Sequence, residues 1–225
     1  MVPIITIDGP SGSGKGTIAR LLADRFGLHC LDSGALYRLV GLAAERASVP
    51  LSSVDRLVEL AAGMEVAFRE GAVFLDQEDV TLAIRTEQAG NAASRVAAVP
   101  EVRAALLQWQ RNYAREPGLV ADGRDMGTVV FPTAGVKIYL TASPEERARR
   151  RYNQLKEKGL DASLARLVAE IRERDERDSS RSVAPLLPAP DAQLLESTSL
   201  SIAEVLERVV SNVQRVYPVL VKQGA

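Results

Sequence analysis

Alternating runs of apolar and polar residues divide the chain into short strands and amphipathic helices. Apolar runs, several of them rich in β-branched residues, are typical of buried strands, and they lie at residues 4–8, 28–31, 119–122, 136–140 and 192–195. Longer segments with helical spacing predict helices at residues 18–26, 35–47, 54–62, 84–99, 102–113, 143–159, 161–180 and 201–217. Because helices alternate with strands, the pattern favours a doubly wound parallel sheet of the α/β class.

Residues 64–75 break this alternation. Residues 64–68 alternate, residues 69–71 are typical of a turn, and residues 72–75 are apolar again. This pattern predicts a β-hairpin between helices, which we interpret as a small inserted lobe. The length of 225 residues suits one α/β domain that carries such an insert.

Composition excludes several classes of protein. The net charge of −1 gives no general attraction to nucleic acid or to a membrane, and no apolar run reaches transmembrane length. The single cysteine, Cys30, excludes an internal disulfide and fits a reducing compartment. Because the chain enters a strand at once, we expect no signal peptide. These features predict a cytoplasmic protein, which we expect to be a monomer with small-molecule partners.

The most informative segment is a glycine-rich run between the first strand and the first helix. It consists of Gly9, Pro10, Ser11, Gly12, Ser13, Gly14, Lys15, Gly16 and Thr17. In this context glycines let several backbone N–H groups converge on one anion, and the helix N-terminus adds partial positive charge. Lys15 supplies a point charge for the outer phosphates of a nucleotide. The alternative is a turn that merely caps a helix.

This run departs from the usual phosphate-binding loop at one position. A Ser or Thr that ligates Mg²⁺ usually follows the lysine directly, whereas here Gly16 follows it and Thr17 comes next. We therefore expect a nucleotide site with a metal that is held partly through water.

Residues 121–127 combine two acids and an arginine with flanking glycines. Asp122 ends a predicted core strand, where an acid can organise Mg²⁺ beside a triphosphate. Arg124 and Asp125 follow in a loop, and loops at the carboxyl ends of parallel strands carry ligands in such folds. The alternative is a solvent-exposed turn.

A charged segment follows at residues 172–181. On a helix Arg174, Asp178 and Arg181 share one face, and Arg177 lies beside them. A charge run alone favours a solvated helix with i,i+4 pairs, but phosphoryl transfer between two anions needs several fixed cations.

Two more basic segments have both a functional and a structural interpretation. One contains Arg147, Arg149, Arg150 and Arg151, and it is either part of a mobile lid or a solvated helix. The other contains Tyr37 and Arg38, and it is either a second anion site or part of an ordinary capped helix that begins at Asp32 and Ser33. We interpret His29 as structural, Trp109 as packing, and Cys30 as an inert buried thiol.

Taken together, these segments resemble the bacterial cytidylate kinase family over nearly the whole chain. The resemblance is carried by residues 7–17, 31–38, 91–94, 121–132, 174–178 and 181–185. Many nucleoside monophosphate kinases share the first run, whereas the others are more specific. The resemblance implies transfer of the ATP γ-phosphoryl group to CMP or dCMP with Mg²⁺. It also implies a P-loop core (residues 1–32, 117–145 and 182–225), a monophosphate-binding lobe with a β insert (33–116) and a short helical lid (146–181).

The resemblance also implies roles for individual residues. The loop 9–17 is the ATP site, and Thr17 and Asp122 serve Mg²⁺. The acceptor is bound by Ser33, Tyr37, Arg38, Ser94, Arg103, Arg124, Asp125, Arg174, Asp178 and Arg181. Of these, Arg38 and Arg124 hold its phosphate, Ser33, Arg103, Asp125 and Arg181 surround the cytosine, and Ser94, Arg174 and Asp178 serve the pentose. Lys15, Asp122, Arg124 and Arg174 are expected to act in catalysis.

Two other classes of function stay open at this stage. One is a kinase for UMP, AMP or a non-nucleotide acceptor, and the other is a nucleotide-dependent binding module without transfer chemistry. The chain has no Asn-Lys-x-Asp run of the kind that reads guanine in a GTPase switch.

Overall fold

The computed structural model describes residues 2–69, 71–157, 159 and 161–220. They form two compact units. The first contains the described residues up to Leu31 and from Tyr113 onwards, and the second is Asp32–Asn112. In the described part of the chain, no helix has the length and apolar character needed to cross a membrane.

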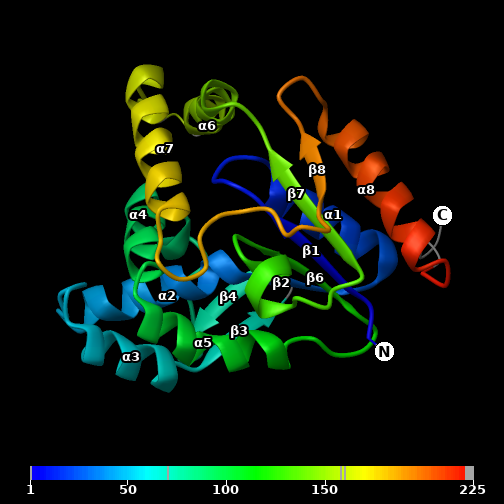
Figure 1. Cartoon of the computed structure of the whole chain (residues 1–225). Helices are drawn as coiled ribbons and strands as arrows, with labels where there is room; N and C mark the ends of the chain where they lie inside the picture. The colour runs from blue at the N-terminus through cyan, green and yellow to red at the C-terminus, as the bar shows by residue number, and fades with distance from the viewer. Residues whose placement is uncertain (1, 70, 158, 160, 221–225) are drawn as a thin grey trace. The chain divides into compact units, whose positions relative to one another are not determined.

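A five-stranded sheet forms the centre of the first unit, in the order β2-β6-β1-β7-β8 (Figure 1). Its strands are β1 (Ile4–Asp8), β2 (His29–Asp32), β6 (Leu119–Gly123), β7 (Val136–Thr141) and β8 (Gln193–Glu196). Strand β1 pairs in parallel with β6 and β7, and β7 pairs in parallel with β8. The predicted α/β class with a parallel sheet is confirmed, and β1 lies at its centre with its carboxyl end leading into the glycine-rich loop.

Helices of the first unit follow the strands as the hydrophobic pattern predicts. They are α1 (Lys15–Phe26), α6 (Pro144–Glu157), α7 (Leu164–Ser179) and α8 (Ile202–Val216), with a short helical turn, η2 (Met126–Val130). Gly27 ends α1 in the left-handed conformation. Ser143 accepts a hydrogen bond from the Glu146 amide at the start of α6, and Ser201 with Glu204 forms a capping box on α8.

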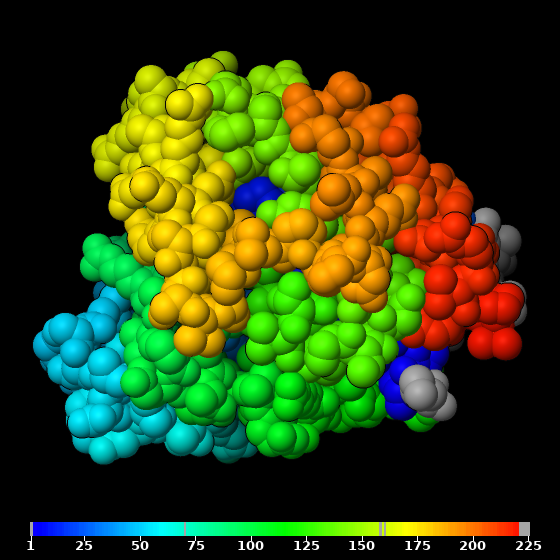
Figure 2. Space-filling model, in the orientation of Figure 1, coloured from blue at the N-terminus to red at the C-terminus, as the bar shows by residue number. Residues whose placement is uncertain are grey.

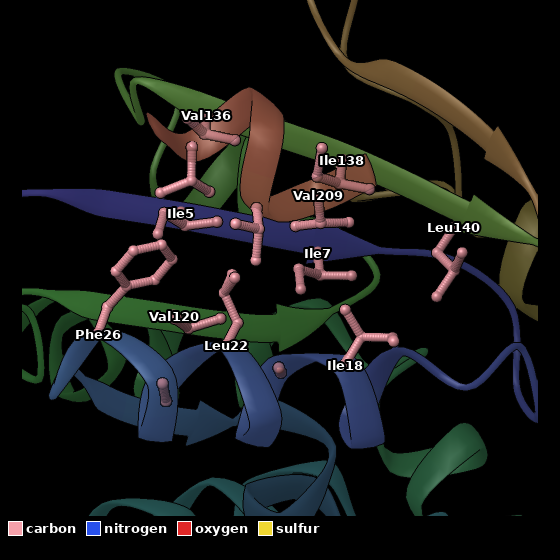
Figure 3. Packing of buried hydrophobic residues seen from close by; sticks show 14 of the residues in the cluster. Ile5, Ile7, Ile18, Leu22, Phe26, Val120, Val136, Ile138, Leu140 and Val209 are labelled. Atoms are coloured by element: carbon pink, nitrogen blue, oxygen red, sulfur yellow. The ribbon is translucent and has the colours of Figure 1, made fainter. Parts of the chain in front are cut away.

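Side chains alternate along β1, so that one face of the strand packs in the apolar core and the other carries polar groups. Ile5 and Ile7 lie in an apolar cluster with Ile18 and Leu22 of α1 and with Val209 of α8 (Figure 3). Because successive residues of a strand point to opposite faces, the intervening Thr6 and Asp8 lie on the other face of the sheet, where Asp8 bonds to η2.

The second unit combines helices with a small antiparallel sheet. Its elements are α2 (Ser33–Arg46), α3 (Val54–Gly63), β3 (Val66–Arg69), β4 (Ala72–Leu75), β5 (Glu78–Asp79), η1 (Ala83–Arg85), α4 (Glu87–Val96) and α5 (Pro100–Asn112). Strands β3 and β4 pair in antiparallel register, which confirms the predicted hairpin, and β5 adds a third strand that the sequence did not predict. Glu70, in the predicted turn, lies outside the described residues.

Several predicted helix boundaries were wrong. The helix expected over residues 84–99 is η1 followed by α4, because Thr86 is extended and its side chain accepts the Ala89 amide as an N-cap. Helix α5 begins at Pro100, two residues before the prediction. Helix α6 ends at Glu157, and Lys158 and Leu160 of the expected lid lie outside the described residues.

Candidate functional site

The glycine-rich loop begins where β1 ends and runs into the N-terminus of α1. Gly9 has φ +152°, and a Cβ atom there would lie 2.0 Å from the carbonyl oxygen of Leu140, so a larger residue would displace β7. Gly14 is the N-cap of α1 and also has positive φ. Only glycine adopts such conformations readily, and a curled backbone before a helix N-terminus is suited to bind a phosphate.

Figure 2 shows blue atoms of the N-terminal segment at the bottom of a hollow, framed by atoms from α6, α7 and the orange segment before β8. Within the loop, the Lys15 side chain is buried and its Nζ donates to the Pro10 carbonyl oxygen at 3.0 Å. Ser13 is also buried, and its hydroxyl has no hydrogen-bond partner among the described residues. A buried donor without a partner is costly, and a phosphate oxygen is a chemically suitable acceptor for it.

Two of the four arginines of α6 contact this loop. Arg147 is buried and donates through NH1 to the Ser11 carbonyl oxygen at 3.0 Å, while its guanidinium also pairs with Asp175 of α7. Arg150 donates to the Ser13 carbonyl oxygen at 3.1 Å. Arg149 is exposed and pairs with Glu146. The sequence did not distinguish among these arginines, and the structure places Arg147 and Arg150 against the loop.

Asp122 explains why a glycine follows Lys15. The Asp122 side chain is buried at the end of β6, on the sheet face that α1 covers. A Cβ atom at position 16 would lie 3.0 Å from Asp122 Oδ2, a tight contact from which the carboxylate would have to move by a few tenths of an ångström. Gly16 therefore lets the carboxylate lie directly against the loop.

The residues near the loop fit a magnesium ion that a nucleotide would bring. In the described part of the chain, no cluster of three or more His, Cys, Asp or Glu side chains could hold a metal by itself. Mg²⁺ in such sites keeps several waters and binds one or two protein oxygens together with phosphates. The Asp122 carboxylate, packed against Gly16, and the exposed hydroxyl-bearing Thr17 next to it are hard oxygen donors of the required kind.

Three predicted acceptor residues meet in a buried ion cluster. Asp178 of α7 accepts from Arg124 Nε at 3.0 Å through Oδ2 and from Arg181 through Oδ1. The side chains of Asp178 and Arg181 are 2% and 4% exposed, and that of Arg124 is 16% exposed. The alternative of a solvated charged helix is therefore wrong for Asp178 and Arg181. The prediction that Arg181 lies on the same helix was also wrong, because α7 ends at Ser179 and Arg181 contacts Asp178 from the segment that follows. Arg174, half-buried, lies four positions before Asp178 on the same helix.

Asp125 is 2% exposed, directly after Arg124 and before η2. The alternative that residues 121–127 form a solvent-exposed turn is therefore wrong, because Asp122, Asp125 and Gly127 are all buried. A buried carboxylate is retained at a cost, which is typical of a functional group or of a group that organises its neighbours.

The second unit holds the remaining predicted acceptor residues. Ser33 and Ser94 are buried on α2 and α4. Arg38 donates to the Ile84 carbonyl oxygen at 2.6 Å. Arg103 donates to the Ala97 carbonyl oxygen at 3.1 Å and lies 5.4 Å from the ring centroid of Tyr37, so its guanidinium is held by a cation–π contact.

Sequence reasoning missed Asp8. This carboxylate is buried and accepts hydrogen bonds from the Met126 and Gly127 amides. Burial raises its pKa from 3.8 to about 6, and nearby Asp125 also raises it, whereas the two amides and Arg124 lower it. An acid at the end of a strand that leads into a phosphate loop was the available signal, but its partners are 118 residues away in sequence.

The residues interpreted as structural have structural contacts. His29 Nε2 lies 2.9 Å from the Glu116 carbonyl oxygen, and Trp109 packs edge-on against Phe68. Cys30 is only partly buried, so the prediction of a buried thiol was wrong; β2 lies at the edge of the sheet, where its residues stay accessible.

Comparison with known proteins gives one family. The family model described as Cytidylate kinase matches residues 5–215. The chain is 61% identical over 218 residues to a cytidylate kinase of Stutzerimonas stutzeri (strain A1501), covering 94% of this chain and 95% of that protein. It is 57% identical over 215 residues to a cytidylate kinase of Aeromonas hydrophila, covering 94% of each. A crystal structure of an uncharacterized protein from Eubacterium ventriosum has a similar fold, with a TM-score of 0.52 at 9% identity over 94% of this chain and 98% of that one.

The raised pKa of Asp8 makes a prediction for stability. Between the unfolded pKa of 3.8 and the folded pKa of about 6, the folded protein binds more protons than the unfolded one. Asp8 therefore contributes most to the free energy of unfolding at low pH, and this contribution decreases as pH rises through about 6. We therefore expect the unfolding free energy of the wild type to fall relative to that of Asp8→Asn between pH 5 and pH 7.5.

Urea unfolding of the two proteins at several pH values measures this difference, and the other titrating carboxylates cancel because both proteins share them. A difference that stays constant from pH 5 to pH 7.5 would show that the pKa of Asp8 is not raised.

Proposed function

This chain belongs to the cytidylate kinase family, and we propose that it transfers the γ-phosphoryl group of ATP to CMP or dCMP, forming ADP with CDP or dCDP. The observation that carries this proposal is the family match over residues 5–215, which includes both the glycine-rich loop and the Arg124–Asp178–Arg181 cluster. The test is a phosphotransfer assay with ATP and a panel of CMP, dCMP, UMP and AMP. Transfer to CMP and dCMP well above the other acceptors supports the proposal.

On the donor side, the loop 9–17 binds the ATP phosphates through backbone amides, and Lys15 neutralises the transferred group. Arg147 and Arg150 support this role, because both hold carbonyl oxygens of the loop and so fix its shape. A preorganised loop loses little free energy to rearrangement when the charge of the transition state develops.

Asp122 and Thr17 would hold Mg²⁺, partly through water. When bound, this ion neutralises phosphate charge and aligns the donor. The protein's own contribution is the close packing of Asp122 against Gly16, which keeps the carboxylate beside the phosphates.

On the acceptor side, Arg38 and Arg124 bind the monophosphate, and Ser33, Arg103, Asp125 and Arg181 surround the cytosine. Ser94, Arg174 and Asp178 serve the pentose, with Tyr37 close to Arg103. Arg174 acts with Lys15, Asp122 and Arg124 on the transferred group. A carboxylate accepts a hydrogen bond from the cytosine 4-amino group and repels the carbonyl oxygen that uracil carries there.

The reaction needs no general base. The attacking atom is a phosphate oxygen that is already ionised at neutral pH, so catalysis rests on alignment and on neutralising charge. The arrangement of fixed cations supports this mechanism, since Asp178 holds both Arg124 and Arg181.

We assign residues 33–116 to a monophosphate-binding lobe, residues 146–181 to a lid, and residues 1–32, 117–145 and 182–225 to the core. The protein would act in the cytoplasm as a monomer. A kinase for UMP or AMP is the main alternative, and the acceptor panel separates it. A nucleotide-binding module would hydrolyse ATP slowly with no dependence on an acceptor.

Replacing Asp125 tests the reading of the base. In Asp125→Ala the acceptor of the cytosine amino group and the repulsion of uracil are both lost, so the ratio of kcat/KM for CMP to that for UMP should fall by roughly tenfold or more. Steady-state kinetics with both acceptors measure the ratio. The matched control is Asp55→Ala, which removes an exposed carboxylate of α3 and should keep the wild-type ratio. An unchanged ratio in Asp125→Ala would remove this residue from base recognition.

Replacing Gly16 tests the position of Asp122. In Gly16→Ala the added Cβ atom would lie 3.0 Å from Asp122 Oδ2 and so displace the carboxylate. Half-maximal turnover should then need roughly tenfold more Mg²⁺. A magnesium titration at saturating ATP measures this requirement. Gly63→Ala, where a Cβ atom meets nothing within 4 Å, is the control. Equal magnesium requirements in Gly16→Ala and wild type would show that Asp122 does not serve the metal.

A further inference from the structure

Asp8 connects the central strand to the turn that follows the acceptor segment. Its Oδ1 accepts the Met126 amide and its Oδ2 accepts the Gly127 amide, both at 2.8 Å. These are the first two residues of η2. The first amides of a helical turn have no acceptor within the turn, so the Asp8 carboxylate caps η2 from a different element.

The residue that precedes the turn does not perform this task. Asp125 is the N-cap of η2, and its side chain makes no capping hydrogen bond, although aspartate is a preferred capping residue. Its carbonyl oxygen instead accepts the Val129 and Val130 amides. The start of η2 is thus held by the main chain of Asp125 on one side and by the carboxylate of Asp8 on the other.

Close packing keeps this connection short. Asp8 and Asp125 are 5% and 2% exposed. A Cβ atom at Gly127 would lie 2.9 Å from Thr6 Oγ1 and 3.3 Å from Asp8 Oδ2. The glycine at position 127 therefore lets the turn lie close against β1, since a larger residue would press on the Thr6, Lys137 and Asp8 side chains.

We propose that Asp8 is a positioning residue for acceptor recognition: by capping η2 from β1, it fixes the backbone from which Arg124 and Asp125 project. Because Asp8 also directly precedes Gly9, a single residue sets the acceptor segment relative to the start of the phosphate loop. This inference rests on the proposed reading of the cytosine by Asp125.

The test uses the CMP-to-UMP ratio of kcat/KM in Asp8→Asn. The amide has nearly the same shape, but its NH₂ group faces one of the two backbone N–H donors, so one hydrogen bond is lost. We expect the ratio to fall by roughly 3- to 10-fold. A loss of folded protein scales both rates equally and leaves the ratio unchanged, so a purely structural role would not move it.

Two further variants separate geometry from charge. Gly127→Ala keeps the Asp8 charge and changes the η2 residue of the contact instead. It should lower the CMP-to-UMP ratio of kcat/KM as Asp8→Asn does. Thr6→Val is the matched control: Thr6 lies on the same strand and face, is fully buried, and its hydroxyl has no hydrogen-bond partner among the described residues. It should keep the wild-type ratio.

Hydrogen exchange gives a readout that does not depend on turnover. In Asp8→Asn the amides of residues 126 and 127 should exchange faster, while those of β1 and β7 should keep their protection.

The proposal is overturned if Asp8→Asn and Gly127→Ala keep the wild-type ratio while Asp125→Ala lowers it. If Asp125→Ala also keeps the ratio, base reading by Asp125 is wrong and the positioning role falls with it, whereas transfer from ATP to CMP would still be measured directly with the wild type.

Discussion

Carboxylates that lie wholly or partly out of solvent and hold cations and amide groups in place are the interaction on which the first unit depends. Asp178 holds Arg124 and Arg181, Asp175 holds Arg147, and Asp8 holds the first amides of η2. Taking a charge out of water is costly, and an ion pair offsets that cost only when its geometry is good. Such pairs are weak evidence of stability, but they fix the direction of a guanidinium far better than an exposed pair does.

That constraint explains how a protein with a net charge of −1 can bind two highly charged nucleotides. Affinity does not come from an overall positive field. In the proposed function it comes from a few cations that are held in place, from loop amides, and from the partial charge of one helix N-terminus. The arginines accordingly differ in their surroundings. Arg147 of α6 and Arg181, just after α7, are buried in ion pairs. Arg149 and Arg166 form exposed pairs with glutamates on their own helices, and Arg150 is partly exposed, pairing with Glu146 and also contacting the loop.

The hydrophobic pattern predicted most of the fold because each strand and helix buries one face against its neighbours. The apolar positions of β1 alternate and those of α1 recur at helical spacing. The predicted helix limits at residues 26, 143 and 201 lie within one residue of the observed ones. The pattern did not predict η2, because that turn is stabilised by Asp8, whose partners are far away in sequence. For the same reason the sequence could name Asp122 and Gly16 separately but could not show that one is small because the other lies against it.

The candidate site also contains residues that the sequence identifies and residues that only their contacts identify. Motifs identified residues with distinctive chemistry, such as Lys15, Arg124 and Asp125. Asp175 and Asp8 have no such signature, because they are distinguished only by their contacts with Arg147 and with η2. For Arg147 the ambiguity lay in its neighbours: four arginines within five positions look equivalent in sequence, and only the packing of α6 against the loop separates them.

If Asp178 serves the acceptor phosphate by holding Arg124 in place, calorimetry with Asp178→Asn reveals it. The quantity to measure is the ratio of CMP affinity to cytidine affinity, because cytidine keeps the sugar and base contacts and lacks only the phosphate. If charge alone mattered, removing a carboxylate beside Arg124 would strengthen phosphate binding. We expect the ratio to fall, since the guanidinium loses its orientation. A ratio that rises would show that Asp178 does not position Arg124 for the phosphate.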